Sequence, residues 1–491
     1  MAYADLDIPP GVFANGTARQ AKGRWRLSNL VRWPNGPDLQ PVGGWRPKAL
    51  SAAIAGKGRA ILTWRANDSS RWIAVGSNAG LWVVSASGTV SNITPTGFAA
   101  GPENAATGAG YGAAVYDQGA YGTPRPDTVN IIPAAVWTLD TWGQHLVGCC
   151  EGDGKLYEWT LNPAAPAAVI TGAPTARRGL VVTAENFILA LGDRNVAWCD
   201  QANSAVWTPA ATNQAGDLDL QTAGVLVCGR RVRGATLVFS TVDVWAATYV
   251  GGVAVYGFQR VGADCGIVSK GAAVSLDARA VWMGKGAFFV YNGGAVEDLA
   301  CEVADHVFQD INPLQVSKVT AWHNTEHGEI WWHYPSVGSL ENDRYVAWSY
   351  RTGKWALGEL ARTAGASAGA FQQPLLVAPD GALLEHEVGW DWESATPFAR
   401  SAPLELGSGD RVVAVAGVVG DERTLGEARV RFFAREFPNA PEAEHGPYPI
   451  STAPTDVRFS ARQVETQVEF TAPADSRIGV LRLDLKPAGR R

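Results

Sequence analysis

The sequence predicts an all-β protein, and its glycine and aromatic content together with its short apolar runs leads to that prediction. The 491 residues include 55 glycines and 20 tryptophans but only 2 methionines. Helical cores favour leucine and methionine, whereas many short strands need glycine turns and aromatic side chains on pleated faces. An apolar content of 46% permits a full core and excludes a disordered chain.

Residues 51–395 consist of short strand-like runs bounded by Gly, Asn, Asp or Pro. A loose repeat places a glycine before an aromatic-rich run, as at residues 80–85 (GLWVVS), 154–159 (GKLYEW) and 286–291 (GAFFVY). Aromatic strands that recur at intervals of about 40–70 residues fit the blades of a β-propeller. The spacing is irregular and there is no WD dipeptide pattern, so a large β-sandwich or a solenoid stays open.

We expect three parts: an extended N-terminal assembly arm at residues 1–50, the β-propeller at 51–395 and a small C-terminal β-sandwich-like unit at 396–491. The C-terminal unit contains runs with alternating apolar residues, such as 428–433 (ARVRFF). A proline-rich loop is expected at residues 438–454, between two of its strands.

Two interruptions of the strand pattern are expected within the propeller region. Apolar residues at roughly helical spacing predict one helix at residues 297–312, before the Asn-Pro pair that would end it. Residues 364–370 (AGASAGA) are small, and we interpret them as a loop.

Charge is distributed unevenly along the chain. The whole sequence carries a net charge of −6; residues 1–60 hold nine basic and three acidic residues and so carry +6, which leaves −12 for the remainder. This asymmetry predicts a basic arm that contacts a polyanion or an acidic protein surface. Ordinary solvated surface cations are the alternative.

The N-terminal segment shows neither of two familiar patterns. It lacks the apolar stretch of a signal peptide, and Pro and Gly interrupt any helical period. No run of eighteen apolar residues exists, so we expect a soluble protein made in the cytosol. The six cysteines form no C-x-x-C pair and mostly lie in apolar runs, which is typical of buried thiols in a reducing compartment.

The search for catalytic or metal-binding motifs yields weak candidates only. His323 and His327 are four residues apart, but their flanks read as two strands joined by a turn, where the imidazoles need not converge. Glu385 with Glu387, or Asp217 with Asp219, could be proposed as glycosidase carboxylates, although no surrounding motif supports this. We therefore predict no catalytic residues, no metal and no cofactor.

Several stretches, spread over the whole chain, resemble a family of tailed-bacteriophage virion proteins. They are residues 8–12 (IPPGV), 15–17 (NGT), 23–25 (GRW), 29–33 (NLVRW), 42–45 (VGGW), 328–336 (GEIWWHYPS), 342–346 (NDRYV), 355–363, 461–464 (ARQV) and 482–491. The family is similar to the tail-nozzle, or packaged-DNA-stabilisation, proteins of short-tailed phages. Residues 100–280 carry no such stretch.

The resemblance implies a structural virion protein rather than an enzyme. It implies a β-propeller subunit in a ring of about six copies below the portal and adaptor, around a channel that retains and then passes the genome. Its partners would be other copies, the adaptor or portal and other tail proteins, with genomic DNA passing without sequence-specific binding. An acidic body would repel the DNA phosphates and let the duplex slide.

Tryptophan and arginine are the residue types that most often anchor protein interfaces. The candidate assembly-interface residues are Arg19, Lys22, Arg24, Trp25, Arg26, Arg32, Trp33, Trp45 and Arg46. For the three tryptophans, packing within the chain is the alternative.

Two other functions stay open. A receptor- or glycan-binding tail module would use exposed tryptophans, for which 331–332 and 390–392 are the candidates, and a propeller glycan hydrolase would need converging carboxylates. Strand alternation allows at most one of Trp331 and Trp332 to be exposed.

Overall fold

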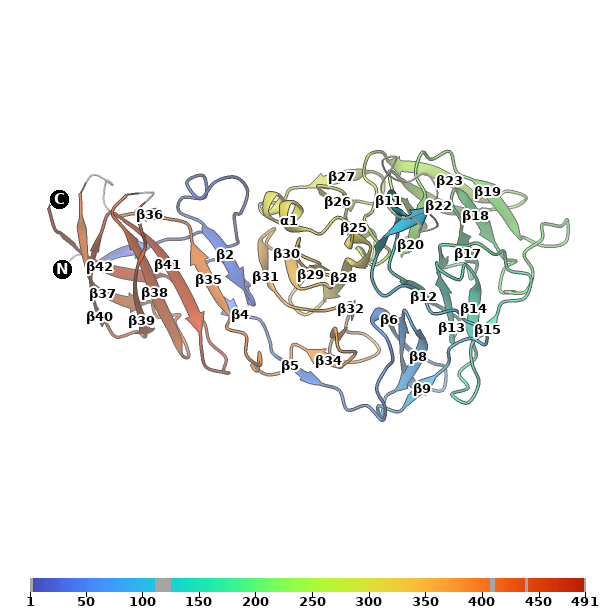
Figure 1. The fold of residues 1–491 in the computed structure, drawn as a ribbon, viewed down its shortest axis with the longest axis horizontal. Coiled ribbons are helices and arrows are strands. Elements are labelled where there is room, and N and C mark those ends of the chain that lie inside the picture. The colour runs from blue at the N-terminus through green and yellow to red at the C-terminus, as the bar shows by residue number, and fades with distance from the viewer. Residues whose placement is uncertain (1–2, 111–124, 407–410, 438–439, 490–491) are drawn as a thin grey trace.

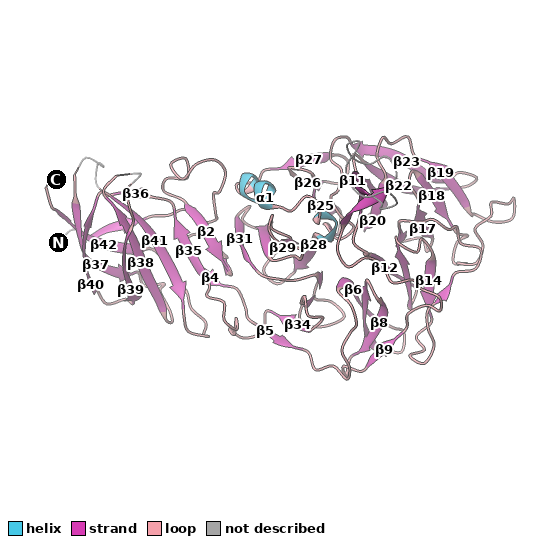
Figure 2. Cartoon of the chain, in the orientation of Figure 1, coloured by secondary structure: helices cyan, strands magenta, loops and turns pink. Residues whose placement is uncertain are grey.

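A computed structural model describes residues 3–110, 125–406, 411–437 and 440–489. Two β-modules lie side by side, a seven-bladed propeller and a two-sheet sandwich, and N-terminal strands run between them (Figure 1). The predicted all-β fold with a propeller body is confirmed. In the described residues the helical elements are α1 (Ala304–Asp310) and the short 3-10 turn η1 (Val316–Lys318), as Figure 2 shows.

Each propeller blade is a four-stranded antiparallel sheet. The first is β6 (Gly58–Arg65), β7 (Arg71–Ser77), β8 (Gly80–Ser85) and β9 (Val90–Asn92). The second is β12 (Trp137–Trp142), β13 (His145–Cys150), β14 (Leu156–Trp159) and β15 (Ala168–Val169). The third is β16 (Gly179–Val182), β17 (Ile188–Leu191), β18 (Asn195–Trp198) and β19 (Gly216–Asp219). The fourth is β20 (Leu226–Val232), β21 (Ala235–Ser240), β22 (Val244–Gly251) and β23 (Val255–Gly262).

The remaining blades follow the same order. The fifth is β24 (Ala273–Leu276), β25 (Arg279–Met283), β26 (Phe288–Tyr291) and β27 (Val296–Leu299). The sixth is β28 (Thr320–Asn324), β29 (Glu329–Tyr334), β30 (Arg344–Ser349) and β31 (Trp355–Glu359). The seventh is β32 (Ala364–Ala366), β33 (Leu375–Val377), β34 (Leu383–His386) and β5 (Trp45–Pro47). A hairpin of β10 (Ala106–Gly110) and β11 (Arg125–Ile132) is inserted between the first two blades.

The N-terminal strand β5 closes the propeller. The first strand of each blade contacts the first strand of the next, and β32 contacts β6, so the ring is complete. The outermost strand of the seventh blade comes from residues 45–47 and pairs antiparallel with β34. Residues from opposite ends of the propeller region therefore share one sheet, which ties the ring shut.

The repeat seen in the sequence marks one position in the blade. Strands β8, β14 and β26, which contain the three aromatic runs, are each the third strand of their blade. Gly154 and Gly286 precede the last two with φ of +69° and +79°, in the turn that follows the second strand. Only glycine adopts this left-handed backbone without steric cost, which explains why it recurs there.

The C-terminal module is a sandwich that includes two N-terminal strands. One sheet has the order β1 (Tyr3–Leu6), β42 (Leu481–Pro487), β37 (Val413–Gly420) and β40 (Thr455–Ala461). The other has the order β2 (Trp25–Asn29), β35 (Phe398–Ser401), β41 (Gln463–Phe470), β38 (Ala428–Arg435) and β39 (Ala443–Ile450), and β36 (Leu404–Glu405) also pairs with β41. The paired strands β1 and β42 lie at the end far from the propeller (Figure 1).

Three local expectations are corrected. The predicted helix at 297–312 is shorter, because residues 296–299 pair with β26 and complete the fifth blade, leaving α1 at Ala304–Asp310. In the proposed loop at 364–370, Ala364–Ala366 is β32, the innermost strand of the seventh blade. A Cβ on Gly365 would lie 2.9 Å from the Trp322 ring, so a small residue is required where the blades converge.

The third correction concerns the proline-rich stretch at 438–454. Residues 443–450 form strand β39, at the edge of the second sandwich sheet. Proline is tolerated there because an edge strand does not use all of its N–H groups in the sheet. Residues 438–439 of that stretch, and residues 490–491 at the end of the last phage-like stretch, lie outside the described part of the chain.

Candidate assembly site

Residues 3–50, here called the N-terminal segment, join the sandwich to the propeller. Strand β2 pairs with β35 in the sandwich, while its side chains bond to the outer strand of the sixth blade. The Ser28 hydroxyl donates to the Leu357 carbonyl at 2.6 Å and accepts the Leu357 N–H at 3.1 Å. The N–H of Leu30 donates to the Tyr345 hydroxyl at 2.6 Å. The segment therefore binds both modules over only a few residues.

Arg32 lies in a buried charged cluster at this junction. It belongs to the short strand pair β3 (Val31–Arg32) and β4 (Gln40–Pro41). Its Nε and Nη2 each lie 3.0 Å from an oxygen of Glu329, and its Nη1 and Nη2 lie 3.0 and 2.5 Å from the oxygens of Glu387. The three side chains are 5–8% exposed. Two bidentate pairs of this kind give both strength and a fixed orientation.

Neighbouring groups complete the hydrogen bonding of both carboxylates. Trp331 Nε1 donates to Glu329 at 3.0 Å, while Asn324 Nδ2 and the Gly43 N–H donate to Glu387 at 2.7 and 2.9 Å. Burial opposes the charged form of Glu387, but attraction to Arg32 outweighs it and lowers the pKa of this carboxyl. Burial lowers the pKa of Arg32, but its two carboxylate partners raise the pKa by more, so the net shift is upward. The single guanidinium thus serves two carboxylates, and the N–H donors around them stabilise the remaining negative charge.

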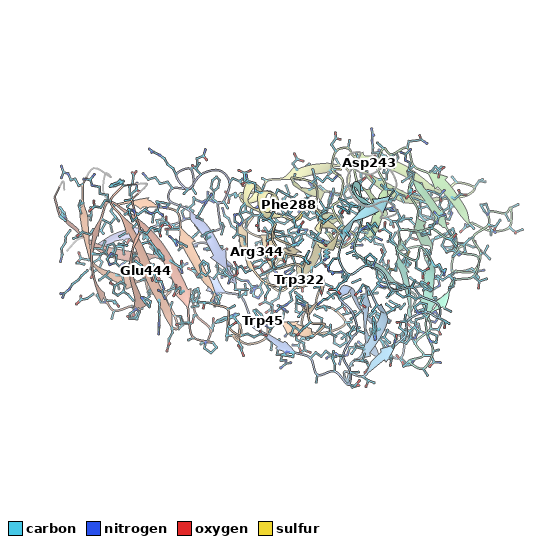
Figure 3. The ribbon with its side chains drawn as sticks, viewed as in Figure 1. Trp45, Asp243, Phe288, Trp322, Arg344 and Glu444 are labelled. Carbon is cyan, nitrogen blue, oxygen red and sulfur yellow. The ribbon has the colours of Figure 1, made fainter. Side chains whose placement is uncertain are left out.

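Trp45 is part of a second buried cluster, at the closing strand. Its ring stacks on His386 with centroids 5.4 Å apart, and its Nε1 donates to Glu393 at 2.9 Å. The Arg362 guanidinium lies 4.9 Å from the Trp45 ring centre and donates from Nε to His386 Nε2 at 2.9 Å. Burial lowers the pKa of Arg362 to about 10 and that of His386 well below its usual value. Figure 3 labels Trp45 together with Trp322, whose ring also neighbours His386.

Within the predicted interface set, the three tryptophans and Arg32 are buried and make their contacts inside this chain. Trp25, Trp33 and Trp45 are 4–6% exposed, and Trp25 lies 6.3 Å from Trp33. Their side chains therefore cannot contact a neighbouring subunit in this conformation, in agreement with the alternative of packing within the chain. The same holds for Arg32.

The other predicted interface cations lie at the surface, and most of them are paired. Lys22 lies 2.5 Å from Glu405, Arg24 lies 2.9 Å from Glu302 and Arg46 lies 2.8 Å from Glu385. Arg26 donates to the carbonyls of Phe13, Asn15 and Gly16, which holds the loop between β1 and β2. Arg19 is exposed on that loop, which projects at the junction in Figure 1.

These pairs give the charge asymmetry of the sequence a physical explanation. The carboxylates that meet the basic N-terminal residues belong to blades of the propeller, to the fifth-to-sixth-blade connection and to the sandwich. They are Glu302, Glu329, Glu341, Glu385, Glu387 and Glu405. An acidic protein surface for the basic segment is therefore present in the chain itself.

The propeller axis contains a cavity of about 570 Å³ lined by residues from all seven blades. Small-molecule sites have volumes of about 300–1,000 Å³, so this cavity is of the size that holds a small molecule. Arg231 of the fourth blade lies 3.1 Å from Asp140 of the second blade. Burial raises the pKa of Asp140, while Arg231 and two backbone N–H groups oppose that rise.

The two candidate metal-binding histidines do not converge, whereas the carboxylates of Asp217 and Asp219 both accept from Asn195 Nδ2, at 3.1 and 2.9 Å. His323 Nε2 lies 3.0 Å from the Tyr350 hydroxyl, whereas His327 Nε2 lies 3.6 Å from Glu387. Glu385 pairs with Arg46 and Lys48, away from the buried Glu387. Throughout the described ranges, no cluster of three or more His, Cys, Asp or Glu could hold a metal ion.

The tryptophans proposed as a glycan platform are largely buried. Trp331 and Trp332 are 3% and 0% exposed, and Trp392 is 5% exposed. In the part of the chain that the structure describes, no helix is long and apolar enough to span a membrane.

Sequence reasoning did not identify Glu329, Glu387, Arg362 or His386 as partners of the N-terminal segment. One signal existed: Glu329 precedes the apolar run IWW, and a carboxylate at the start of a buried strand requires a cation. The identity of that cation depends on contacts between residues about 300 positions apart, which no local pattern encodes.

This architecture defines the chain as a seven-bladed β-propeller joined to a β-sandwich. Comparison with protein-family models and with curated protein sequences finds no match. Among solved structures, a streptogramin B lyase has 10% identity and a TM-score of 0.41, covering 70% of this chain and 97% of that chain.

Two further solved structures have comparable similarity. Selenomethionine-substituted virginiamycin B lyase from Staphylococcus aureus has 8% identity and a TM-score of 0.43, covering 70% of this chain and 98% of that chain. The WD40 β-propeller domain of Doa1 has 10% identity and a TM-score of 0.42, covering 70% and 96%. Similarity at this level says nothing about the activity of this chain.

Proposed function

We propose that this chain is a structural subunit of a bacteriophage tail, in the nozzle ring below the portal and adaptor that retains packaged DNA and forms its exit channel. The observation that carries the proposal is that several phage-like stretches of the sequence contact one another in the folded chain. Residues 29–33 contact residues 328–336 through Arg32 and Glu329, and contact residues 342–346 through Leu30 and Tyr345. Stretches about 300 residues apart thus form one junction.

The chemistry of that junction supports a structural role. Its charges are paired and buried, and its aromatic rings are packed, so it holds the sandwich and the propeller in one orientation. A subunit that bears the force of a packaged genome needs a rigid connection of this kind.

The axial cavity bears on where DNA would pass. Because the cavity on the propeller axis is of the size that holds a small molecule, the channel for DNA would lie between copies of the chain in the ring. The net charge of −12 outside residues 1–60 would limit adhesion of the duplex to that channel.

The test is the assembly state of the full-length chain. Native mass measurement and electron microscopy should show a ring of about six copies, alone or on the portal and adaptor of the same virion. A protein that stays monomeric at every concentration and with those partners, or that cleaves polysaccharide, would overturn the proposal.

Substitutions at the surface test the role of the N-terminal segment in assembly better than its truncation does. Removal of residues 1–46 would delete β1 and β2 of the sandwich and Trp45 of the closing strand, so loss of assembly would only report misfolding. Arg19→Glu should weaken assembly while the circular dichroism spectrum is retained. Arg233→Glu, in a propeller turn beside Asp277, is the matched control.

A second candidate, a ligand-binding tail module, is favoured by the axial cavity alone. Glycan-array binding by the full-length chain, in the absence of ring assembly, would support it over the nozzle.

A further inference from the structure

The axial cavity has an excess of positive charge. Its lining includes Arg59, Arg230, Arg231 and Lys270, against the single carboxylate of Asp140. A cation in a partly enclosed cavity loses hydration and requires compensation from a carboxylate or from several oxygen acceptors.

Three of the four cations have a carboxylate partner in the chain. The pairs are Arg59 with Glu341 at 2.6 Å, Lys270 with Glu151 at 2.9 Å, and Arg231 with Asp140 at 3.1 Å. Asp140 also accepts the backbone N–H groups of Thr141 and Val182, both at 2.8 Å, so its oxygens are already engaged.

Arg230 is the exception: among the described residues it forms no ion pair, only main-chain carbonyls bind it, and its interaction with Asp140 is electrostatic without a direct contact. Its Nε donates to the Ala273 carbonyl at 3.1 Å, Nη1 to Gly229 at 2.9 Å and Nη2 to Lys270 at 2.7 Å. A guanidinium has five N–H donors, so one N–H on each terminal nitrogen stays free. The three carbonyls fix the half-buried side chain and leave one donor on each of its two terminal nitrogens.

Arg230 is one of the residues that line the axial cavity, and several other lining residues are glycines. Gly229, Gly271 and Gly365 are among the residues that line the cavity. A Cβ on Gly229 would lie 2.4 Å from Val181, so a larger residue at position 229 would displace that neighbour. The Thr138 hydroxyl, on another wall, is buried and has no hydrogen-bond partner among the described residues.

We propose that the axial cavity binds a small oxyanion, a carboxylate or phosphate group, on the two free N–H donors of Arg230. Two parallel N–H groups of one guanidinium match two oxygens of such a group. The bound anion would neutralise the lining cation that forms no ion pair with any carboxylate of the described residues. This inference is independent of the role in a phage tail.

The experiment is calorimetric titration of the full-length chain with sodium phosphate and, separately, sodium acetate, each against sodium chloride at equal ionic strength. We expect saturable binding of at least one oxyanion and none of chloride. Arg230→Gln should weaken it by about tenfold or more, as expected for a charge-assisted bidentate contact. Arg233→Gln, an exposed arginine just beyond the same strand, should bind as the wild type does.

Each outcome decides the proposal. Binding of phosphate but not acetate, or the reverse, identifies the ligand class. Absence of saturable binding, or equal binding by Arg230→Gln, overturns it. If Arg230→Gln does not fold, anomalous scattering from selenate soaked into wild-type crystals replaces it: a peak beside Arg230 supports the site, and its absence refutes it.

Discussion

Trp45 and His386 face each other across the ladder that closes the propeller, with their ring centroids 5.4 Å apart. One residue comes from the N-terminal segment and the other from the last strand of the propeller region. Because Arg362 binds both rings, a single cluster fastens the ring of blades to the segment that continues into the sandwich. The same cluster of residues therefore closes the propeller and connects it to the sandwich.

Trp45→Ala should weaken the pairing of β5 with β34 that closes the propeller. Loss of a buried tryptophan costs about 3–5 kcal/mol, and here it also removes the stacking partner of His386. We expect a lower free energy of unfolding in urea and faster amide exchange in β5 and β34 than in the sandwich. Leu27→Ala, at a 39% exposed position of the same segment, should change stability by less than about 0.5 kcal/mol.

Arg32→Met should destabilise the chain through the carboxylates it leaves behind. Glu329 and Glu387 would stay buried without their cation, at a cost of about 3–5 kcal/mol. Arg46→Met, whose arginine is 64% exposed, should cost less than about 1 kcal/mol. Equal losses in urea unfolding at pH 7 would contradict the role assigned to the buried cluster.

His333 should make stability fall in acid. Its Nδ1 lies 3.2 Å from the Leu360 carbonyl and its Nε2 accepts from Trp322 Nε1 at 3.1 Å, which is possible only for the neutral ring. Burial first, and Arg362 second, lower the pKa of His333 from 6.5 to about 3. Between these values the unfolded chain binds the proton and the folded chain does not, so stability decreases as pH falls below 6.5.

The measurement is the free energy of unfolding in urea from pH 7 to pH 4. His333→Phe should lower stability at pH 7, because it removes two hydrogen bonds. It should also reduce the slope against pH by about 1.4 kcal/mol per pH unit, the value for one proton. An unchanged slope would show that His333 does not titrate as the geometry requires.

Gly76→Ala should damage the contact between the first two blades. A Cβ at residue 76 would lie 2.5 Å from Trp137, a fully packed ring whose Nε1 donates to the Ser77 carbonyl. Overpacking of this kind costs about 1–3 kcal/mol. Gly338→Ala, where a Cβ would meet open space, is the matched control and should be nearly neutral in thermal unfolding.

The cysteines should resist alkylation in the folded protein. All six are free thiols and five are buried. Burial raises the pKa of Cys149 and Cys301 to about 12 and that of Cys199 and Cys265 to about 11, so little reactive thiolate forms at pH 8. Iodoacetamide should label the urea-unfolded chain at all six positions and the native chain at none. Rapid labelling of native Cys149 would contradict this.

The sequence by itself determined the fold class and the local strand pattern. Glycine precedes the aromatic strands β14 and β26 because each follows a left-handed turn, and this backbone requirement is short-range. The turn between β28 and β29 at residues 325–328 was predictable for the same reason.

Only the tertiary structure decided which side chains the buried residues of the N-terminal segment contact. Its charge indicated an acidic partner, but local pattern does not say whether that partner is DNA, another subunit or the same chain. The structure brings Arg32 to Glu329 and Glu387, and Trp45 to His386, across about 300 residues. Such pairs depend on the closure of the propeller, because a buried charge is stable only where the fold places its counterion beside it.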